Sequence, residues 1–168
     1  MNSSEISVGV EFPNIKLKTT LGELALPEHY KNKWFVLFSH PKNFTAICTA
    51  EFVSFAKSYS NFKSLNCELV GYSLDTLESH KEWVKSIYDR YDVDISYPIV
   101  SDAEKVISSK LGILYSKHPD ITLRSTFIVD SNSVIRSILH YPPELPRNVD
   151  EILRIVEELQ KFDEKNNL

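Results

Sequence analysis

The stretch Trp34-Phe35-Val36-Leu37-Phe38-Ser39 decides the fold. It has the length of a strand and an unbroken apolar character, which is typical of a central strand that is buried on both faces. Pro41 ends this strand, and Asn43 and Thr45 can cap a helix that follows. The apolar residues of that helix recur every three or four positions, at Phe52, Phe55, Ala56, Tyr59 and Phe62. The sequence therefore predicts a buried strand that leads through a short loop into a helix.

Strand and helix patterns alternate on either side of this unit. We predict further strands at 15–19, 23–26, 67–74, 97–100, 125–130 and 134–141. We predict further helices at about 79–91, 103–111 and 149–159. The strand at 97–100 is expected at an edge of the sheet, because Pro98 has no N–H to donate. This order predicts an α/β protein with a mixed central β-sheet flanked by helices, which is a thioredoxin-like fold.

Length and composition fit a single domain that covers residues 1–168. Hydrophobic residues make up 42% of the chain, and 9 Phe, 8 Tyr and 2 Trp supply apolar area for a core, which excludes global disorder. The net charge of −4 indicates no basic surface for a nucleic acid or an acidic membrane. The sequence has no apolar run of about eighteen residues and no N-terminal signal pattern. We therefore expect a cytoplasmic protein with neither nucleic acid nor membrane as a partner.

The residues that predict chemistry lie in the segment 39–51, SHPKNFTAICTAE. Cys48 falls in the first turns of the predicted helix, where free backbone N–H groups and the helix dipole favour a thiolate over a thiol. This position is suited to a nucleophile. A lone cysteine is more often a small buried residue, by about two to one. The residues around Cys48 decide between the two interpretations.

The spacing Pro41-x-x-x-Thr45-x-x-Cys48 resembles the active-site motif of peroxiredoxins, which are thiol peroxidases on a thioredoxin-like scaffold. The wider string, from Ser39-His40-Pro41 to Cys48-Thr49-x-Glu51, is most similar to the one-cysteine (1-Cys, peroxiredoxin-6-like) subgroup. Further matches follow in the same order: Ser73-Leu74-Asp75 with His80 and Trp83, the strand that begins at Arg124, Tyr141-Pro142, and the segment from Arg147 to Leu153. Several motifs in one order are far more specific than a single cysteine.

The resemblance implies a role for each residue of the motif. Cys48 would be the peroxidatic thiolate, which attacks the terminal oxygen of hydrogen peroxide or an organic hydroperoxide and becomes a sulfenic acid. The Thr45 hydroxyl would hydrogen-bond the thiolate and the peroxide. Arg124 would stabilise the thiolate and polarise the O–O bond. Pro41 would pack over the cysteine and limit the access of water. The resemblance implies no cofactor and no metal.

Three further residues are expected to support the site. Glu51 and Arg147 match a pair that braces the active-site arginine in the family, although each could equally be a solvated helix residue. His40 could tune the loop or assist a protonation, and it could equally be a structural residue at the end of a buried strand.

The two cysteines predict how the oxidised protein is reduced. Family members with a resolving cysteine would have it in the segment 163–168 or at Val53, and neither place has one. Cys67 opens a predicted strand, so we interpret it as a structural residue. We therefore expect an external thiol, such as glutathione or thioredoxin, to reduce the Cys48 sulfenic acid. One-cysteine relatives usually have a further C-terminal domain, which we expect this chain to lack.

Other functions fit the sequence less well. A thioredoxin-type disulfide reductase needs Cys-x-x-Cys, and Glu51 stands three residues after Cys48. A cysteine phosphatase needs an arginine six residues after its nucleophile, and Ser54 occupies that place. A non-catalytic thioredoxin-fold module, either a redox sensor or a chaperone-like protein, stays as the alternative. The resemblance also implies at least a homodimer, formed through aromatic-rich surface near the active-site edge.

Overall fold

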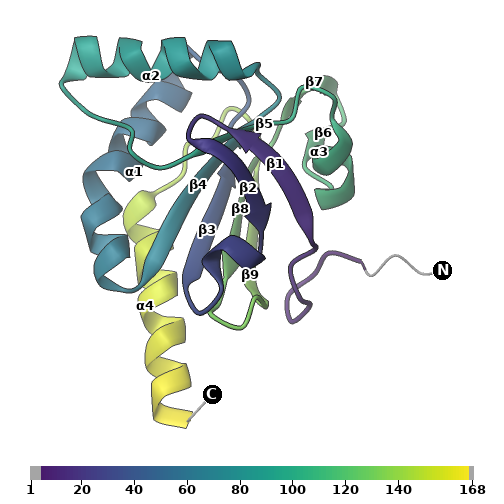
Figure 1. Cartoon of the computed structure of the whole chain (residues 1–168), viewed down its shortest axis with the longest axis vertical. Coiled ribbons are helices and arrows are strands. Elements are labelled where there is room, and N and C mark those ends of the chain that lie inside the picture. The colour runs from purple at the N-terminus through teal and green to yellow at the C-terminus, as the bar shows by residue number, and fades with distance from the viewer. Residues whose placement is uncertain (1–4, 167–168) are drawn as a thin grey trace.

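The computed structural model describes residues 5–166, which form nine strands and four α-helices (Figure 1). The strands are β1 (Ile15–Thr19), β2 (Gly22–Leu26), β3 (Trp34–Ser39), β4 (Cys67–Ser73), β5 (Ile99–Ser101), β6 (Leu114–Tyr115), β7 (His118–Thr122), β8 (Arg124–Val129) and β9 (Ile135–Tyr141). The helices are α1 (Ala46–Ser64), α2 (Leu77–Tyr91), α3 (Val106–Leu111) and α4 (Val149–Asn166), with a short 3-10 turn η1 (Glu28–Tyr30).

Seven of the strands form one mixed sheet in the order β2-β1-β5-β4-β3-β8-β9. Strands β3, β4 and β5 run parallel to one another, and the other neighbouring pairs are antiparallel. Helices α1, α2 and α4 lie on one side of the sheet, and α3 lies on the other (Figure 1). The expected thioredoxin-like α/β fold with a mixed central sheet is therefore confirmed.

Strand β3 lies in the interior of the sheet because both of its faces are apolar. Trp34, Val36 and Phe38 pack in one cluster with residues of α1, α2 and α4. Phe35 and Leu37 belong to a second cluster on the opposite face, together with the N-terminal segment and the end of α3. The exposed fraction of these five side chains is at most 6%. The prediction of a strand buried on both faces is confirmed, and the loop that follows it is anchored in the core.

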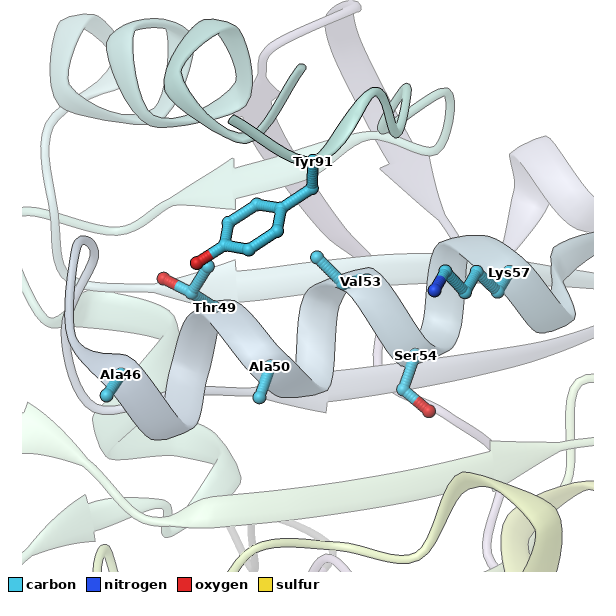
Figure 2. A pocket seen from close by; sticks show the side chains of 7 residues that line it. All are labelled: Ala46, Thr49, Ala50, Val53, Ser54, Lys57 and Tyr91. Atoms are coloured by element: carbon cyan, nitrogen blue, oxygen red, sulfur yellow. The ribbon is translucent and has the colours of Figure 1, made fainter. Parts of the chain in front are cut away.

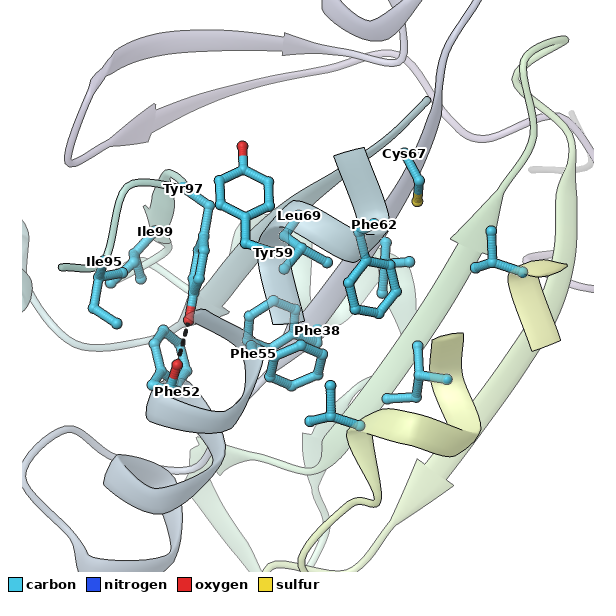
Figure 3. Close-up of a cluster of buried hydrophobic side chains, with 14 of the residues drawn as sticks. Phe38, Phe52, Phe55, Tyr59, Phe62, Cys67, Leu69, Ile95, Tyr97 and Ile99 are labelled. Carbon is cyan, nitrogen blue, oxygen red and sulfur yellow. Dashed lines mark hydrogen bonds between the residues drawn. The ribbon is translucent and has the colours of Figure 1, made fainter. Parts of the chain in front are cut away.

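Aromatic side chains fill the space between the sheet and α1 (Figure 3). Phe38 stacks on Phe55 with the ring centroids 3.8 Å apart. The Tyr97 hydroxyl donates a hydrogen bond of 3.1 Å to the Phe52 carbonyl. A Cβ atom on Gly71 of β4 would come within 2.9 Å of the Phe52 ring. The absence of a side chain at this glycine therefore lets α1 lie close to the sheet.

The structure corrects the position expected for the strand near Pro98. Strand β5 lies between β1 and β4, so it is an inner strand and not an edge strand. Pro98 precedes β5, so its missing N–H removes no hydrogen bond from the ladder. Its carbonyl accepts a hydrogen bond of 2.9 Å from the Gly71 N–H.

Two further elements differ from the expectation. The helix expected at 103–111 begins only at Val106, because the residues before it form a turn closed by a hydrogen bond from the Lys105 N–H to the Asp102 carbonyl. The hairpin of β6 and β7 was not predicted from the sequence. Its register is irregular at Leu114 and Tyr115, so it has no regular alternation of apolar residues.

Candidate active site

The loop between β3 and α1 places Cys48 at the beginning of a helix. Thr45 is the N-cap residue, with extended backbone angles, and Cys48 is the third residue of α1. The first turn of a helix has N–H groups without partners inside the helix, and its dipole places positive charge there. The Cys48 side chain is 0% exposed, so water does little to screen these charges from the sulfur.

Arg124 brings a positive charge to this sulfur from a distant part of the chain. It is the first residue of β8, the strand that pairs with β3. Its Nη1 lies 3.3 Å from the Cys48 Sγ, and the two residues are 76 positions apart. Its Nε donates a hydrogen bond of 2.7 Å to the Pro143 carbonyl, which fixes the orientation of the guanidinium group. The structure thus brings together the two residues that the sequence connected only through a resemblance.

Glu51 and Arg147 hold Arg124 in place. Glu51 lies one turn after Cys48 on α1 and accepts a hydrogen bond of 2.5 Å from Arg124 Nη1. Arg147 donates to both carboxylate oxygens of Glu51, from Nε and from Nη2, each at 2.9 Å. The backbone N–H of Arg147 donates a further hydrogen bond of 2.8 Å to Glu51. All three side chains are buried, so they form an interior ion-pair cluster and not a solvated surface pair.

The charges of this cluster do not cancel among themselves. Burial would raise the pKa of the Glu51 carboxyl, but the hydrogen bonds and charge of Arg147, together with the charge of Arg124, hold that pKa below its ordinary value. Glu51 is therefore ionised, and two guanidinium groups share one carboxylate. One positive charge is left over in an interior of low dielectric constant. The Cys48 sulfur lies in contact with Arg124, one of the two groups that share this charge.

Pro41 and Thr45 lie at different depths in the loop before Cys48. Pro41 is buried and Thr45 is exposed. The Thr45 hydroxyl donates a hydrogen bond of 2.9 Å to the Lys42 carbonyl, and its side chain makes no capping hydrogen bond to α1. Because a hydroxyl has a single proton, Thr45 does not donate to the Cys48 sulfur in this conformation. The role implied for Thr45 requires a rotation of its side chain.

His40 is fully buried beside the site. Burial lowers the pKa of His40 well below its ordinary value, and the charges of Arg147 and Arg124 lower it further, so the ring is neutral. Its Nε2 lies 2.6 Å from the Asn43 Oδ1. The sequence predicted Asn43 as a helix cap, but its side chain instead connects His40 with His80. Nothing in the sequence signalled this connection, because the two histidines meet only through the packing of α2 against the loop.

A groove of about 460 Å³ runs along the outer face of α1 (Figure 2). It is lined by Ala46, Thr49, Ala50, Val53, Ser54, Lys57 and Tyr91. Cys48 does not line it, since that side chain points into the core.

Across residues 5–166, no three His, Cys, Asp or Glu side chains are grouped to hold a metal ion. Over the same range, no helix has the length and apolar character needed to cross a bilayer.

The fold, and a buried cysteine at a helix start beside a guanidinium group, define the class of thiol-dependent oxidoreductases. The AhpC/TSA family matches residues 8–138 of the chain. The peroxiredoxin of Hyperthermus butylicus is 48% identical over 94% of this chain and 68% of its own length. The peroxiredoxin of Thermotoga petrophila is also 48% identical, over 94% of this chain and 74% of its own length. The chain belongs to the peroxiredoxin family, whose members are thiol peroxidases, and the expectation of such an enzyme is confirmed.

Solved peroxiredoxin structures share the fold over most of the chain. The peroxiredoxin 6 of Arenicola marina, as a cysteine-to-serine mutant, gives a TM-score of 0.86 at 33% identity and covers 92% of this chain and 74% of that one. A yeast mitochondrial 1-Cys peroxiredoxin gives a TM-score of 0.90 at 31% identity and covers 96% of this chain and 79% of that one. The scaffold around the cysteine is thus that of known peroxiredoxins.

Proposed function

We propose that this peroxiredoxin reduces hydrogen peroxide and organic hydroperoxides at Cys48, and that an external thiol reduces the oxidised sulfur. The thiolate attacks the terminal oxygen of the hydroperoxide, so that an S–O bond forms while the O–O bond breaks. The leaving oxygen takes up a proton and departs as an alcohol or as water, and Cys48 becomes a sulfenic acid. A first thiol attacks this sulfur and releases water, and a second thiol displaces Cys48 and leaves as a disulfide with the first.

The contact of 3.3 Å between Arg124 Nη1 and the Cys48 Sγ carries this proposal. Before the reaction, the guanidinium group stabilises the thiolate. As the O–O bond breaks, negative charge moves from the sulfur to the leaving oxygen, and the same cation stabilises it there. Because Pro143 and Glu51 already hold Arg124, the charge is in position before the peroxide arrives.

Thr45 and Pro41 complete the site in this proposal. A rotated Thr45 hydroxyl can donate to the sulfur or to the peroxide, since it stands at the N-cap of the helix that contains Cys48. Pro41 has no N–H, so this buried part of the loop presents no competing donor. Glu51 and Arg147 act indirectly, by holding Arg124.

Two properties of Cys67 favour an external thiol over an internal disulfide. Burial raises the pKa of the Cys67 thiol far above its ordinary value, and the charge of Glu68 raises it further, so the thiol stays protonated and is a poor nucleophile. Cys67 also follows the far end of α1, and the helix between Cys48 and Ser64 rises by about 24 Å. A disulfide needs Cα atoms within about 7 Å. The segment 163–168 has no cysteine in the sequence, and its last two residues lie outside the described structure.

The yeast mitochondrial 1-Cys peroxiredoxin guides the choice of reductant. The thiol resolving mechanism of that protein operates via glutathione/thioredoxin systems. We therefore propose glutathione and thioredoxin as the first thiols to test with this chain, with a small dithiol as a third arm.

Peroxide consumption by matched cysteine variants tests the proposal. Cys48→Ser is expected to abolish turnover with every reductant, whereas Cys67→Ser is expected to retain nearly all of it. Equal turnover of Cys48→Ser and the wild type would instead support a non-catalytic redox sensor or chaperone-like module. Mass spectrometry after peroxide treatment should show a sulfenic acid or a mixed disulfide at Cys48. A Cys48–Cys67 disulfide as the main product would contradict reduction by an external thiol.

We further propose that the chain forms at least a homodimer. Phe44, Tyr88 and Tyr91 are 54%, 53% and 52% exposed, and they lie just before α1 and along α2. Exposed aromatic side chains are enriched in protein interfaces. Sedimentation at micromolar concentration is expected to show a dimer that Phe44→Ser weakens. A monomer alone would contradict this proposal.

A further inference from the structure

A chain of three hydrogen bonds connects the active-site loop with α2 and β5. The His80 Nε2 lies 2.9 Å from the Val100 carbonyl oxygen. The His80 Nδ1 lies 2.8 Å from the Asn43 Nδ2, and the Asn43 Oδ1 lies 2.6 Å from the His40 Nε2. The three side chains are at most 4% exposed, so water does not compete for these hydrogen bonds.

The Val100 carbonyl at one end sets the direction of every hydrogen bond in this series. A carbonyl only accepts, so the His80 Nε2 must hold a proton and donate it to Val100. Burial lowers the pKa of His80, which keeps the ring neutral and leaves its Nδ1 as an acceptor for the Asn43 amide. The same amide nitrogen donates a hydrogen bond of 3.1 Å to the Ser79 Oγ, a hydroxyl that can accept it in this orientation of the amide. The Asn43 Oδ1 therefore faces His40 and accepts from its Nε2–H.

This direction leaves His40 with a bare Nδ1. Of the side-chain nitrogen and oxygen atoms buried within the described residues, this is the one without a hydrogen-bond partner. Such atoms are rare in folded proteins. The ring centroid of His40 lies 4.7 Å from that of Phe52 and 4.9 Å from that of Trp83. Because Phe52 follows Cys48 by one turn on the same face of α1, the free acceptor belongs to the part of the core that contains the sulfur.

We propose that Asn43 and His80 are positioning residues for the peroxidase reaction, which hold His40 in the Nε2-protonated tautomer and keep its Nδ1 free to accept a hydrogen bond that forms only during turnover. The reaction in this statement rests on the proposed function, but the tautomer does not. The charged and titratable groups that act on the two rings fit the assignment. His80, Arg147 and Arg124 disfavour a proton on His40, and Asp75 is the acidic group that acts on His80.

Nitrogen-15 NMR of the resting, full-length protein tests the tautomer without any measurement of turnover. From about pH 6 to about pH 8, His40 and His80 are each expected to show a protonated Nε2 and an unprotonated Nδ1. A proton on the His40 Nδ1 in the resting protein would overturn the proposal, whether or not the protein consumes peroxide.

Substitutions of Asn43 separate positioning from packing. Asn43→Asp keeps an acceptor toward His40 but removes the donor toward His80, so the carboxylate requires a proton on the His80 Nδ1. We expect the NMR titration of His80 to move to higher pH, and the pH profile of kcat/KM to move with it. Asn43→Leu removes both hydrogen bonds, so His40 should populate both tautomers and kcat/KM should fall by about tenfold.

The control is Asn61→Asp, which places the same charge on the exposed face of α1. It is expected to change neither the histidine spectra nor the pH profile. A folded Asn43→Leu protein with wild-type turnover and one His40 tautomer would overturn the proposal. If Asn43→Leu does not fold, Asn43→Asp decides, because an unmoved His80 titration and an unchanged pH profile would likewise overturn it.

Discussion

In the proposed mechanism, Arg124 acts on Cys48 through a fixed charge, so its effect should be measurable before any peroxide binds. Arg124→Ala is expected to shift the pH profile of Cys48 alkylation by iodoacetamide to higher pH by at least about one unit, because the thiolate loses its nearest cation. Peroxide consumption should fall in parallel. Arg124→Lys is the matched variant, since it keeps the charge without the planar guanidinium geometry. Its alkylation profile should lie between those of Arg124→Ala and the wild type. An unchanged alkylation profile in Arg124→Ala would remove the role assigned to this residue.

Glu51 should matter for stability as well as for activity. Glu51→Gln leaves two buried guanidinium groups without a carboxylate, so we expect the free energy of unfolding to fall by about 3–5 kcal/mol. Urea unfolding followed by tryptophan fluorescence measures this loss. Glu151→Gln is the matched control, because Glu151 pairs with the exposed Arg154. The loss of this ion pair should leave the free energy of unfolding nearly unchanged. A similar midpoint for Glu51→Gln and the wild type would contradict the picture of a buried ion-pair cluster.

At the scale of single residues, the resemblance to peroxiredoxins pointed to both Cys48 and Arg124. The structure adds the side-chain orientations and hydrogen-bond partners, which the spacing of residues in a sequence does not contain. The direction of the Thr45 hydroxyl depends on the Lys42 carbonyl, a neighbour that no motif specifies. The place of Asn43 between two histidines depends on how α2 packs against the loop. Side-chain orientation and hydrogen-bond partners arise from tertiary contacts, so a single sequence does not predict them.

At the scale of elements, the close approach of α1 to β4 depends on Gly71. Gly71→Ala places a methyl group within 2.9 Å of the Phe52 ring, so we expect the free energy of unfolding to decrease by about 1–3 kcal/mol. Urea unfolding measures the change. Gly71→Ala should cost less stability when it is combined with Phe52→Leu than when it is made in the wild type, because the smaller side chain leaves room for the methyl group. Additive losses in the double variant would show that the contact with Phe52 is not the cause.

The elements themselves were largely predictable from apolar patterns. The run in β3 and the three-to-four spacing in α1 indicated the central unit, because both reflect which faces are buried. The position predicted for β5, at an edge of the sheet, was wrong because Pro98 was counted inside the strand, whereas it precedes the ladder. Strand order in a sheet depends on pairing between distant segments, which local patterns do not record.

For the molecule as a whole, acid should reduce stability in two stages. The pKa values of His40 and His80 are lowered by burial, so below about pH 6.5 the unfolded chain binds protons that the folded chain does not, and stability falls with pH. The pKa of Glu51 is also lowered, because its arginine partners outweigh its burial, so a second loss begins below about pH 4.5. Urea midpoints at pH 7.5, 5.5 and 4.0 should decrease in that order.

Histidine variants provide the control for the first stage. His80→Gln should reduce the loss between pH 7.5 and 5.5, since one of the two buried rings is removed. His118→Gln changes an exposed side chain and should leave that loss unchanged. A stability that does not vary between these two pH values would contradict the assignment of neutral buried histidines.

The ion-pair cluster is assembled from α1, β8 and the segment before α4, and Glu51 and Arg147 are 96 positions apart. A growing or partly unfolded chain therefore has a cysteine without its cation, and that sulfur reacts as an ordinary thiol. In the proposed mechanism, rapid chemistry with peroxide would begin only when α1, β8 and the segment before α4 have folded together. The rate of oxidation at this one sulfur would consequently serve as a reporter of that folding step.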